Sequence, residues 1–597
     1  MQTREEIFKQ IESQPNVSVL VVGGGINGIS TFRELAMQGV DVLLVEKNDF
    51  SSGSSAASSH MMHGGVRYLE NGEFRLVREA LTERNRLLVN ASHYVTPQPT
   101  IIPIFKALSG VLNAPLKFVG LSTKPSERGS LIIRLGLVMY DAFASIGKVM
   151  PNHSFISKAD MLKRFTGIDK NIRTAAQYYD AFLAQPERLA VELLLDAEAV
   201  NERAVALNYA SVSGGDRDTV EITDEMTGVT YTVKPTVVVN AAGPWIDIAN
   251  AEMGQQSRFI RGTKGSHLVF DHPELRESLG ETELFFENTD GRIVLMLPLQ
   301  DRLIVGTTDI FIENPDASVC TEDEIEYVLN LIKKLFPNTT VSRDDIVFTF
   351  SGVRPLPNQE AASAGQVSRD HSVEVIEPSE KNAYPILSLV GGKWTTFRAF
   401  GEYTARNVLD RLNMEYAVDT KNIPIGGGKG LPMTEQQQRG WVSQVASTSG
   451  QTEAQVAVWL DRYGTRAEAV ATFAGQGEDA PLEHLEGYTH REVRFVTRHE
   501  KVFTVLDFVL RRSLIAMTGH LSKPLLVELA GCVGKELGWS DAEIERQIAA
   551  TEKRLLEKNV TEVTDGQSTL AGTAPKEGEA EVIEEPLPEL VAVPAGD

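Results

Sequence analysis

The chain has 597 residues, which is enough for more than one domain and for a large buried core. Its formal net charge of −23 argues against nucleic acid as a partner. It has only two cysteines, Cys320 and Cys532, which excludes a disulfide framework and a cysteine-built metal cluster and is typical of a reducing compartment.

The start of the sequence, "MQTREEIFKQ", is charged and lacks the apolar stretch of an export signal. No apolar run reaches the ~18–20 residues that a membrane-spanning helix needs. The best candidate, residues 130–143, is interrupted by Arg134. We therefore expect a protein that is intracellular, or that attaches to a membrane without crossing it.

Residues 17–49 predict a strand, a tight glycine turn, a helix and a second strand. The run "VSVLVV" is continuous and β-branched, as in a strand buried on both faces. In Gly23-x-Gly25-x-x-Gly28 the first glycine permits the turn, the second lets the backbone approach a pyrophosphate, and the third packs helix on strand. Glu46, at the end of the second strand, is placed to bind ribose hydroxyls. This pattern predicts a dinucleotide site; its position near the start of the chain favours FAD over NAD.

Later elements alternate in type along the chain. A helix at 187–202 precedes another buried-strand candidate at 235–245, and strands of antiparallel character cluster between 266 and 309. The pattern is helical from about 430 to 558. From 559 onward the composition is acidic and rich in Pro, Gly and Thr, which predicts a disordered tail.

A series of motifs stands in one order along residues 17 to about 520 and resembles the FAD-dependent glycerol-3-phosphate dehydrogenases of the aerobic, respiratory kind. The motifs are "SSHMMHGGVRYLE" (58–70), "NAAGPWID" (240–247), "KGSHLVF" (264–270), "LIVGTTD" (303–309), "SGVRPL" (351–356), "SRDHSVE" (368–374), "GGKWTTFR" (391–398), "YGTR" (463–466) and "RFVTRHEKVFTVLDFVLRR" (494–512).

The resemblance implies an α/β fold: a Rossmann-type FAD-binding domain of the glutathione-reductase/D-amino-acid-oxidase type, a mixed-sheet substrate domain and a C-terminal α-helical domain. The expected boundaries are an N-terminal extension (1–16), FAD-binding segments (17–100, 150–260 and 350–415, within 17–425), substrate-binding segments (101–149 and 261–349), a helical domain (426–558) and a disordered acidic tail (559–597).

The residues expected to hold FAD lie in the three FAD-binding segments. Small serines let the chain run along a diphosphate, and adjacent glycines let a flat isoalloxazine ring approach the backbone. A second helix N-terminus, after the strand that precedes 391, suits an anionic end of the flavin. The expected cofactor residues are Gly23, Gly25, Asn27, Gly28, Glu46, Ser58, Ser59, His63, Gly64, Gly65, Ala242, Gly243, Gly392, Lys393, Trp394 and Thr395.

An anionic polyol substrate needs several cationic donors around its phosphate. The resemblance places Arg67, Tyr68, Arg354, Arg369 and Lys393 there. Each cation has the alternative of an ordinary ion pair, and Arg67 that of a solvated surface arginine.

His267 is the first candidate for the base, followed by Arg354 and His63. The alternative for each histidine is a structural side chain with its hydrogen bonds satisfied.

The resemblance implies hydride transfer from C2 of sn-glycerol 3-phosphate to N5 of FAD, which gives dihydroxyacetone phosphate, with electrons passed to a membrane quinone. The basic, partly apolar segment 106–128 is a candidate for peripheral attachment to the inner face of the plasma membrane, with a mobile surface loop as the alternative. A homodimer is possible by resemblance. The rival functions are an α-glycerophosphate oxidase that uses oxygen and releases hydrogen peroxide, an amine or amino-acid oxidase, and a flavin-binding interaction protein without turnover.

The chain departs from the family pattern beside the expected cofactor. His60 stands where a lysine is usual, and Met61, Met62 and Trp394 stand where aliphatic residues are usual. These positions bear on the flavin potential and on the preferred acceptor.

Overall fold

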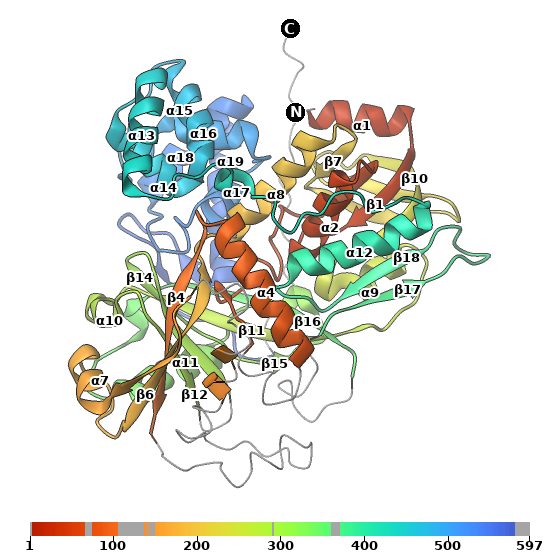
Figure 1. The fold of residues 1–597 in the computed structure, drawn as a ribbon. Helices are drawn as coiled ribbons and strands as arrows, with labels where there is room; N and C mark the ends of the chain where they lie inside the picture. Colours follow the sequence, from red (N-terminus) through yellow and green to blue (C-terminus); the bar gives the residue numbers. More distant parts are fainter. Residues whose placement is uncertain are drawn as a thin grey trace.

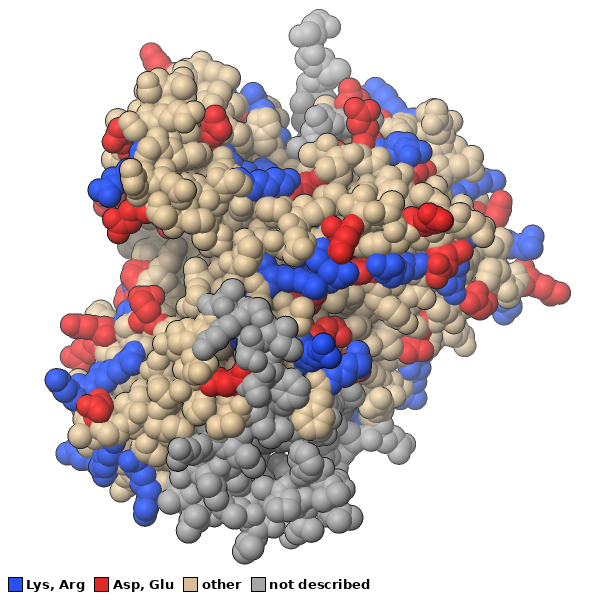
Figure 2. Space-filling model, in the orientation of Figure 1, with Lys and Arg blue, Asp and Glu red and all other residues tan. Residues whose placement is uncertain are grey.

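The computed structural model describes residues 3–65, 74–105, 136–138, 140–141, 150–288, 292–359 and 370–578. Two large sheets and a separate group of helices make up the molecule (Figure 1). In the face shown in Figure 2, acidic and basic side chains are interspersed, so the net negative charge is not gathered into one patch there. Within the described residues, no helix combines the length and the apolarity that crossing a membrane requires.

The first sheet is the expected dinucleotide-binding sheet. From edge to edge its strands are β17 (Ser372–Ile376), β18 (Ile386–Val390), β10 (Thr230–Asn240), β1 (Asn16–Val22), β2 (Val42–Val45) and β7 (Ala204–Leu207), with β8 (Ala210–Gly214) and β9 (Val220–Asp224) branching from β10. The strands from β18 to β7 are parallel. Val19, Leu20 and Val21 in the central strand β1 are fully buried, which is why this run is continuously apolar.

Helices cover both faces of this sheet. The helices α2 (Ile26–Met37), α8 (Pro186–Val200) and α12 (Phe397–Leu412) share one apolar core with it. On the other face, α1 (Arg4–Ser13) buries Ile7, Phe8 and Ile11, and α9 (Ile246–Glu252) lies near β10 and β18. The expected N-terminal extension is therefore a helix that packs on the sheet.

The second sheet is mixed. Its strands run β15 (Ile310–Phe311), β11 (Ile260–Phe270), β14 (Arg302–Gly306), β13 (Ile293–Leu299), β12 (Glu283–Glu287), β4 (Val95–Ile104), β6 (Thr174–Leu183) and β3 (Met61–Met62), with β16 (Ile346–Pro357) on β11 and β5 (Ser154–Ser157) on β6. The pair β12–β4 is parallel and the others are antiparallel. The helices α7 (Lys158–Arg164), α10 (Pro273–Leu279) and α11 (Glu322–Leu335) accompany it.

Three strands of this sheet, β3, β5 and β6, lie wholly in segments that the sequence boundaries give to the FAD-binding domain. β3 precedes residue 100, and both β5 and β6 lie within 150–260. Their partners decide where they lie: Met61 and Met62 pair with Phe182 and Ala181. Because the pairing partner of a strand can come from a distant part of the chain, the position of a strand in the sequence does not decide which sheet it joins.

The C-terminal part is helical, as the sequence predicts. Its helices are α13 (Glu435–Ser449), α14 (Glu453–Tyr463), α15 (Ala467–Gly475), α16 (His490–His499), α17 (Val505–Asp507), a π-helical turn (Phe508–Arg512), α18 (Lys523–Leu537) and α19 (Asp541–Asn559). Their core includes Trp459 and continues into the second sheet at Leu297 and Phe350.

Residues 559–578 differ from the expected disordered tail. They contain the short antiparallel pair β19 (Thr561–Glu562) and β20 (Thr569–Leu570), and Thr561, Val563 and Ser568 are buried. Asn559 exchanges hydrogen bonds with Thr349 of β16. Apolar residues among the acidic ones pack this stretch against the sheet. The average composition of the segment does not show these buried positions.

Candidate active site

The glycine turn between β1 and α2 has the geometry that a dinucleotide requires. Gly23 has φ +106°, and a Cβ there would lie 2.7 Å from the carbonyl oxygen of Ala241. A Cβ on Gly28 would overlap the carbonyl oxygen of Gly23, so helix and strand pack at this point without a side chain. Gly25 is the N-cap of α2 and brings no side chain over the helix N-terminus, where partial positive charge favours a phosphate. These residues fit the diphosphate of FAD.

Hydrogen bonds join the start of α2 to the segment before α12. Oγ of Ser55 accepts a hydrogen bond from the amide of Ile26, 2.9 Å away, and Nε1 of Trp394 donates to the carbonyl of Ser55 at 3.0 Å. Asn27 donates to the carbonyl of Gly391 at 3.0 Å. Trp394 is thus a buried side chain that links the segment before α12 to the segment around Ser55.

Gly392 and its neighbours complete that segment. Gly392 has φ +94°, and a Cβ there would lie 2.5 Å from Nδ2 of Asn27. Thr395 is buried just before α12 begins. On the opposite side of the turn, a Cβ on Gly23 would also come within 2.9 Å of Cα of Ala242, and Gly243 follows with φ +58°. Expected cofactor residues of three chain segments, 23–28, 242–243 and 392–395, therefore meet around one turn.

The segment 58–65 enters the second sheet beside this turn. The amide of His60 donates to Oγ of Ser58, 3.3 Å away, and His60 has the left-handed φ of +56°. Burial lowers the pKa of His60 to about 4, so the ring that replaces the usual lysine is neutral near pH 7. Its ring lies near that of Phe182.

Ser59 contacts the first candidate base. Its Oγ lies 2.8 Å from Nε2 of His267, whose ring stacks on Phe350 at 4.8 Å. Burial, and then the positive charge of Arg354, lower the pKa of His267 to about 3. Nδ1 of His267 is buried and has no hydrogen-bond partner within the part of the chain that the structure describes. A neutral imidazole of such low basicity is a weak proton acceptor.

His63 has the opposite character. Its Nδ1 lies 3.3 Å from Oδ2 of Asp180, and about a third of its side chain is exposed. Burial disfavours the imidazolium, but the hydrogen bond and charge of Asp180 outweigh it, so the pKa of His63 is raised; the charge of Lys393 opposes this rise. His63 and Lys393 are therefore close enough to act on one another electrostatically.

Asp180 is held by four groups. Its Oδ1 accepts from the amide of Gly64 (2.8 Å), from Arg84 (2.8 Å) and from the hydroxyl of Tyr140 (2.6 Å), while Oδ2 faces His63. Burial would raise the pKa of Asp180, but these hydrogen bonds and charges lower it, so the group is a carboxylate. It orients the expected flavin-contacting residues 63 and 64 together.

The cations expected to bind the substrate phosphate divide into two groups. Arg354 donates to Asp309 (3.1 Å) and to Oγ1 of Thr307 (3.1 Å), so it is an ion-pair residue with a quarter of its side chain exposed. Lys393 is half-buried close to His63. Three of the expected residues lie outside the described residues: Arg67, Tyr68 and Arg369. The rest of the segment that follows Gly65 and the candidate membrane segment 106–128 also lie outside them.

Sequence reasoning missed three residues of this site. Asp309 stands at the end of the quoted motif "LIVGTTD", which contained the signal for it. Asp180 and Arg84 carried none: Asp180 lies in β6, Arg84 lies in α4 (Phe74–Asn90), and both are more than nine-tenths buried. Only tertiary pairing shows what they do.

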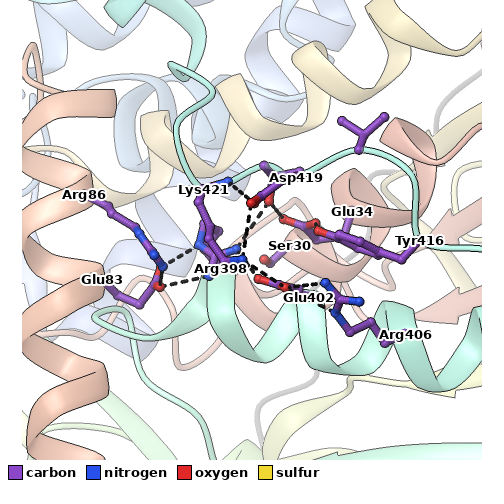
Figure 3. Close-up of polar contacts among 12 residues, drawn as sticks. Ser30, Glu34, Glu83, Arg86, Arg398, Glu402, Arg406, Tyr416, Asp419 and Lys421 are labelled. Carbon is purple, nitrogen blue, oxygen red and sulfur yellow. Dashed lines mark hydrogen bonds and ion pairs between the residues drawn. The ribbon is translucent and has the colours of Figure 1, made fainter.

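An ion network fastens the helices that carry the site (Figure 3). Arg398 of α12 forms a two-pronged pair with Glu83 of α4, at 2.6 and 2.8 Å, and also pairs with Glu402 at 2.7 Å. Thr420, which Arg398 also contacts, donates to Glu34 of α2 at 2.6 Å. α2, α4 and α12 are thus joined by one network of ion pairs and hydrogen bonds.

Comparisons with known proteins agree with this architecture. The family model described as FAD-dependent oxidoreductase matches residues 18–407, and the one described as the C-terminal domain of α-glycerophosphate oxidase matches residues 418–544. A glycerol-3-phosphate dehydrogenase of Synechocystis sp. is 31% identical over 554 residues, covering 89% of this chain and 94% of that protein. An aerobic glycerol-3-phosphate dehydrogenase of Staphylococcus aureus is 28% identical over 530 residues, covering 85% and 88%.

A solved structure shows the same fold. The glycerol-3-phosphate dehydrogenase from Bacillus halodurans, determined in complex with FAD, superposes with a TM-score of 0.68 at 24% identity, covering 93% of this chain and 97% of that chain. The expected fold class, a Rossmann-type FAD-binding fold with a mixed-sheet domain and a helical C-terminal domain, is confirmed.

Proposed function

Because the chain belongs to the family of FAD-dependent glycerol-3-phosphate dehydrogenases, we propose that it oxidises sn-glycerol 3-phosphate at C2 to dihydroxyacetone phosphate. Bound FAD supplies the acceptor for the hydride that leaves C2. The protein's share of the reaction is to bind the phosphate, to orient C2 and to remove the proton of the C2 hydroxyl.

The observation that carries the proposal is the pair His63–Asp180 within electrostatic reach of Lys393. A base must have a pKa near the working pH to accept a proton effectively. His63 meets this better than His267, because the pKa of His63 is raised and that of His267 is lowered to about 3. We assign the proton transfer to Nε2 of His63, with Nδ1 bound to Asp180.

The phosphate needs cations that face the same space. Lys393 supplies one charge beside His63, and Arg354 supplies a guanidinium that Asp309 holds in place. We propose that Arg67, Tyr68 and Arg369 complete the phosphate site, as the family motifs suggest. His267, neutral and bonded to Ser59, then serves as a polar wall of the site instead of its base.

We propose a quinone as the electron acceptor and peripheral attachment to the inner face of the cytoplasmic membrane. Support comes from the relatives, which are named dehydrogenases, one of them aerobic. Oxygen is the alternative acceptor, because the matching C-terminal family model is named after α-glycerophosphate oxidase.

The test is anaerobic mixing of the yellow holoprotein with sn-glycerol 3-phosphate while the visible flavin band is followed. We expect rapid bleaching with this substrate and none with glycerol, which lacks the phosphate, or with glycine. Absence of bleaching by glycerol 3-phosphate with FAD bound, or equal bleaching by glycine, would refute the proposal. Readmission of a soluble quinone analogue or of oxygen to the bleached protein then identifies the acceptor by which of them restores the band faster.

A further inference from the structure

Side chains of the helical C-terminal part bind the turn that follows β2. Asp49 in this turn is fully buried. Its Oδ2 accepts from Nε of Arg511 at 2.6 Å and from Nη1 of Arg512 at 2.7 Å. Its Oδ1 accepts from Nη2 of Arg512 at 2.9 Å and from Nδ2 of Asn208 at 2.8 Å. Four N–H donors from three residues therefore saturate this carboxylate, and two of those residues lie more than 460 positions away in the chain.

The same turn lies directly on the glycine turn of the cofactor site. The amide of Gly24 donates to Oε2 of Glu46 at 2.6 Å, and the amide of Ser51 donates to the carbonyl of Gly24 at 2.9 Å. A Cβ on Gly24 would lie 2.8 Å from both Cβ of Glu46 and Cδ1 of Phe50. Two hydrogen bonds therefore hold residues 46–51 against the glycine turn, at a contact that leaves no space for a side chain on Gly24.

The two arginines are themselves firmly placed. Arg512 is fully buried and also donates to the carbonyl of Glu500, at 3.0 Å from Nε. Arg511 also bonds Asp507 at 3.0 Å, and Asp507 accepts from the hydroxyl of Tyr209 at 2.6 Å. The charges of Arg512 and Arg511 outweigh the burial of Asp49, so the pKa of this carboxyl is lowered and the group is ionised.

We propose that Arg511 and Arg512 of the helical domain are positioning residues for FAD: through Asp49 they fix Glu46 and so hold the adenosine end of the cofactor. The helical domain then contributes to the cofactor site indirectly, because these two arginines act on FAD through the turn 46–51. The inference rests on FAD binding by this family and on the assignment of Glu46 to the ribose, and it does not depend on the substrate proposed above.

A direct test compares Arg512→Lys with Arg302→Lys. Lysine keeps the charge and loses the two-pronged geometry. Arg302 is the matched control because it is another buried arginine that contacts the helical domain. It lies in β14 of the second sheet, and its Nε donates to the carbonyl of Thr518 at 2.9 Å. We expect R512K apoprotein to bind FAD roughly 10-fold more weakly, inside the ~5–150-fold range of coupling between sites, and R302K to bind it as the wild type does.

The adenosine half gives a second readout. ADP affinity of the R512K apoprotein should fall by the same factor as FAD affinity, while the visible spectrum of the FAD-saturated variant stays unchanged. Loss of FAD affinity with ADP affinity retained, or an equal loss in R302K, would overturn the proposal.

Hydrogen exchange in the wild-type chain needs no variant and covers the case in which R512K does not fold. Because coupling is reciprocal, FAD binding should slow exchange in residues 500–513 of the helical domain. Protection that stays confined to residues 17–60, with 500–513 unchanged, would contradict the proposed link.

Discussion

Replacing Asp180 with Asn tests the role of His63 with almost no change in shape. An amide oxygen can still accept from Gly64, Arg84 and Tyr140 at the Oδ1 position, while the amide nitrogen takes the place of Oδ2 opposite His63. The amide then donates to Nδ1 of His63, which forces the proton onto Nε2. A ring with Nε2 protonated cannot accept the hydroxyl proton there.

The expected loss has two parts. The reaction loses most of what a positioned base contributes, about 10²–10⁴-fold in the rate of flavin reduction. Stability falls as well, because Arg84, only 2% exposed in its side chain, is left as a buried cation without a counter-charge, and breaking such a pair costs about 3–5 kcal/mol. The first part is read from stopped-flow bleaching of the flavin and the second from urea unfolding.

The pH dependence has a definite sign. The folded-state pKa of Asp180 is lowered, so its stabilisation is present above its unfolded value and is lost as acid protonates it. The folded-state pKa of His63 is raised, so its stabilisation is present below its unfolded value and is lost as the pH rises through the folded value. Both act together between about pH 4 and pH 6.5. The stability gap between wild type and D180N should be widest there.

Tyr140→Phe is the matched control, because it removes one hydrogen bond to the same carboxylate and leaves its charge and its bond to His63. We expect Y140F to lose some stability but to keep its rate within a few-fold of wild type. If D180N binds FAD and bleaches as fast as the wild type, or if Y140F is slowed as much as D180N, the assignment of the base to His63 is wrong.

Two further changes probe the frame around the site. Gly28→Ala puts a methyl group onto the carbonyl of Gly23, so we expect purified protein with little bound flavin, whereas Gly531→Ala, where the Cβ meets open space in α18, should keep its full flavin absorbance. Glu83→Gln leaves the buried Arg398 without its main counter-charge and should lower the free energy of unfolding in urea by about 3–5 kcal/mol; a loss below about 1 kcal/mol would show that the network in Figure 3 is not stabilising.

The parts of the fold that follow from local pattern could be read from the sequence. The strand–turn–helix unit around Gly23 and Gly28 is one of these, because its strand is continuously apolar and its glycines have fixed spacing. The helical C-terminal part is another. In both cases the residues that determine the structure lie within a few turns of each other.

The parts that depend on distant partners could not be read from it. Asp180 gives no local signal, because its partner Gly64 lies 116 positions away. Residues 559–578 look disordered by composition, yet Val560 packs with Val319 and Ala571. The difference in pKa between His63 and His267 could not be read from the sequence either, since the charges that separate the two values come from Asp180 and Arg354.

Buried charges join the cofactor segments at three places: Asp49, Asp180 and the pair of Glu83 with Arg398. Apolar contacts would cost less desolvation at each place, but they tolerate sliding because they have no direction. A carboxylate whose acceptor positions are filled by guanidinium and amide donors has one geometry, since any shift leaves a buried charge unsatisfied. We infer that these clusters fix the turn after β2 against the helical domain. Through α4 they also fix the segment 63–64 and the start of α12 relative to each other, which hydrophobic packing alone would leave adjustable.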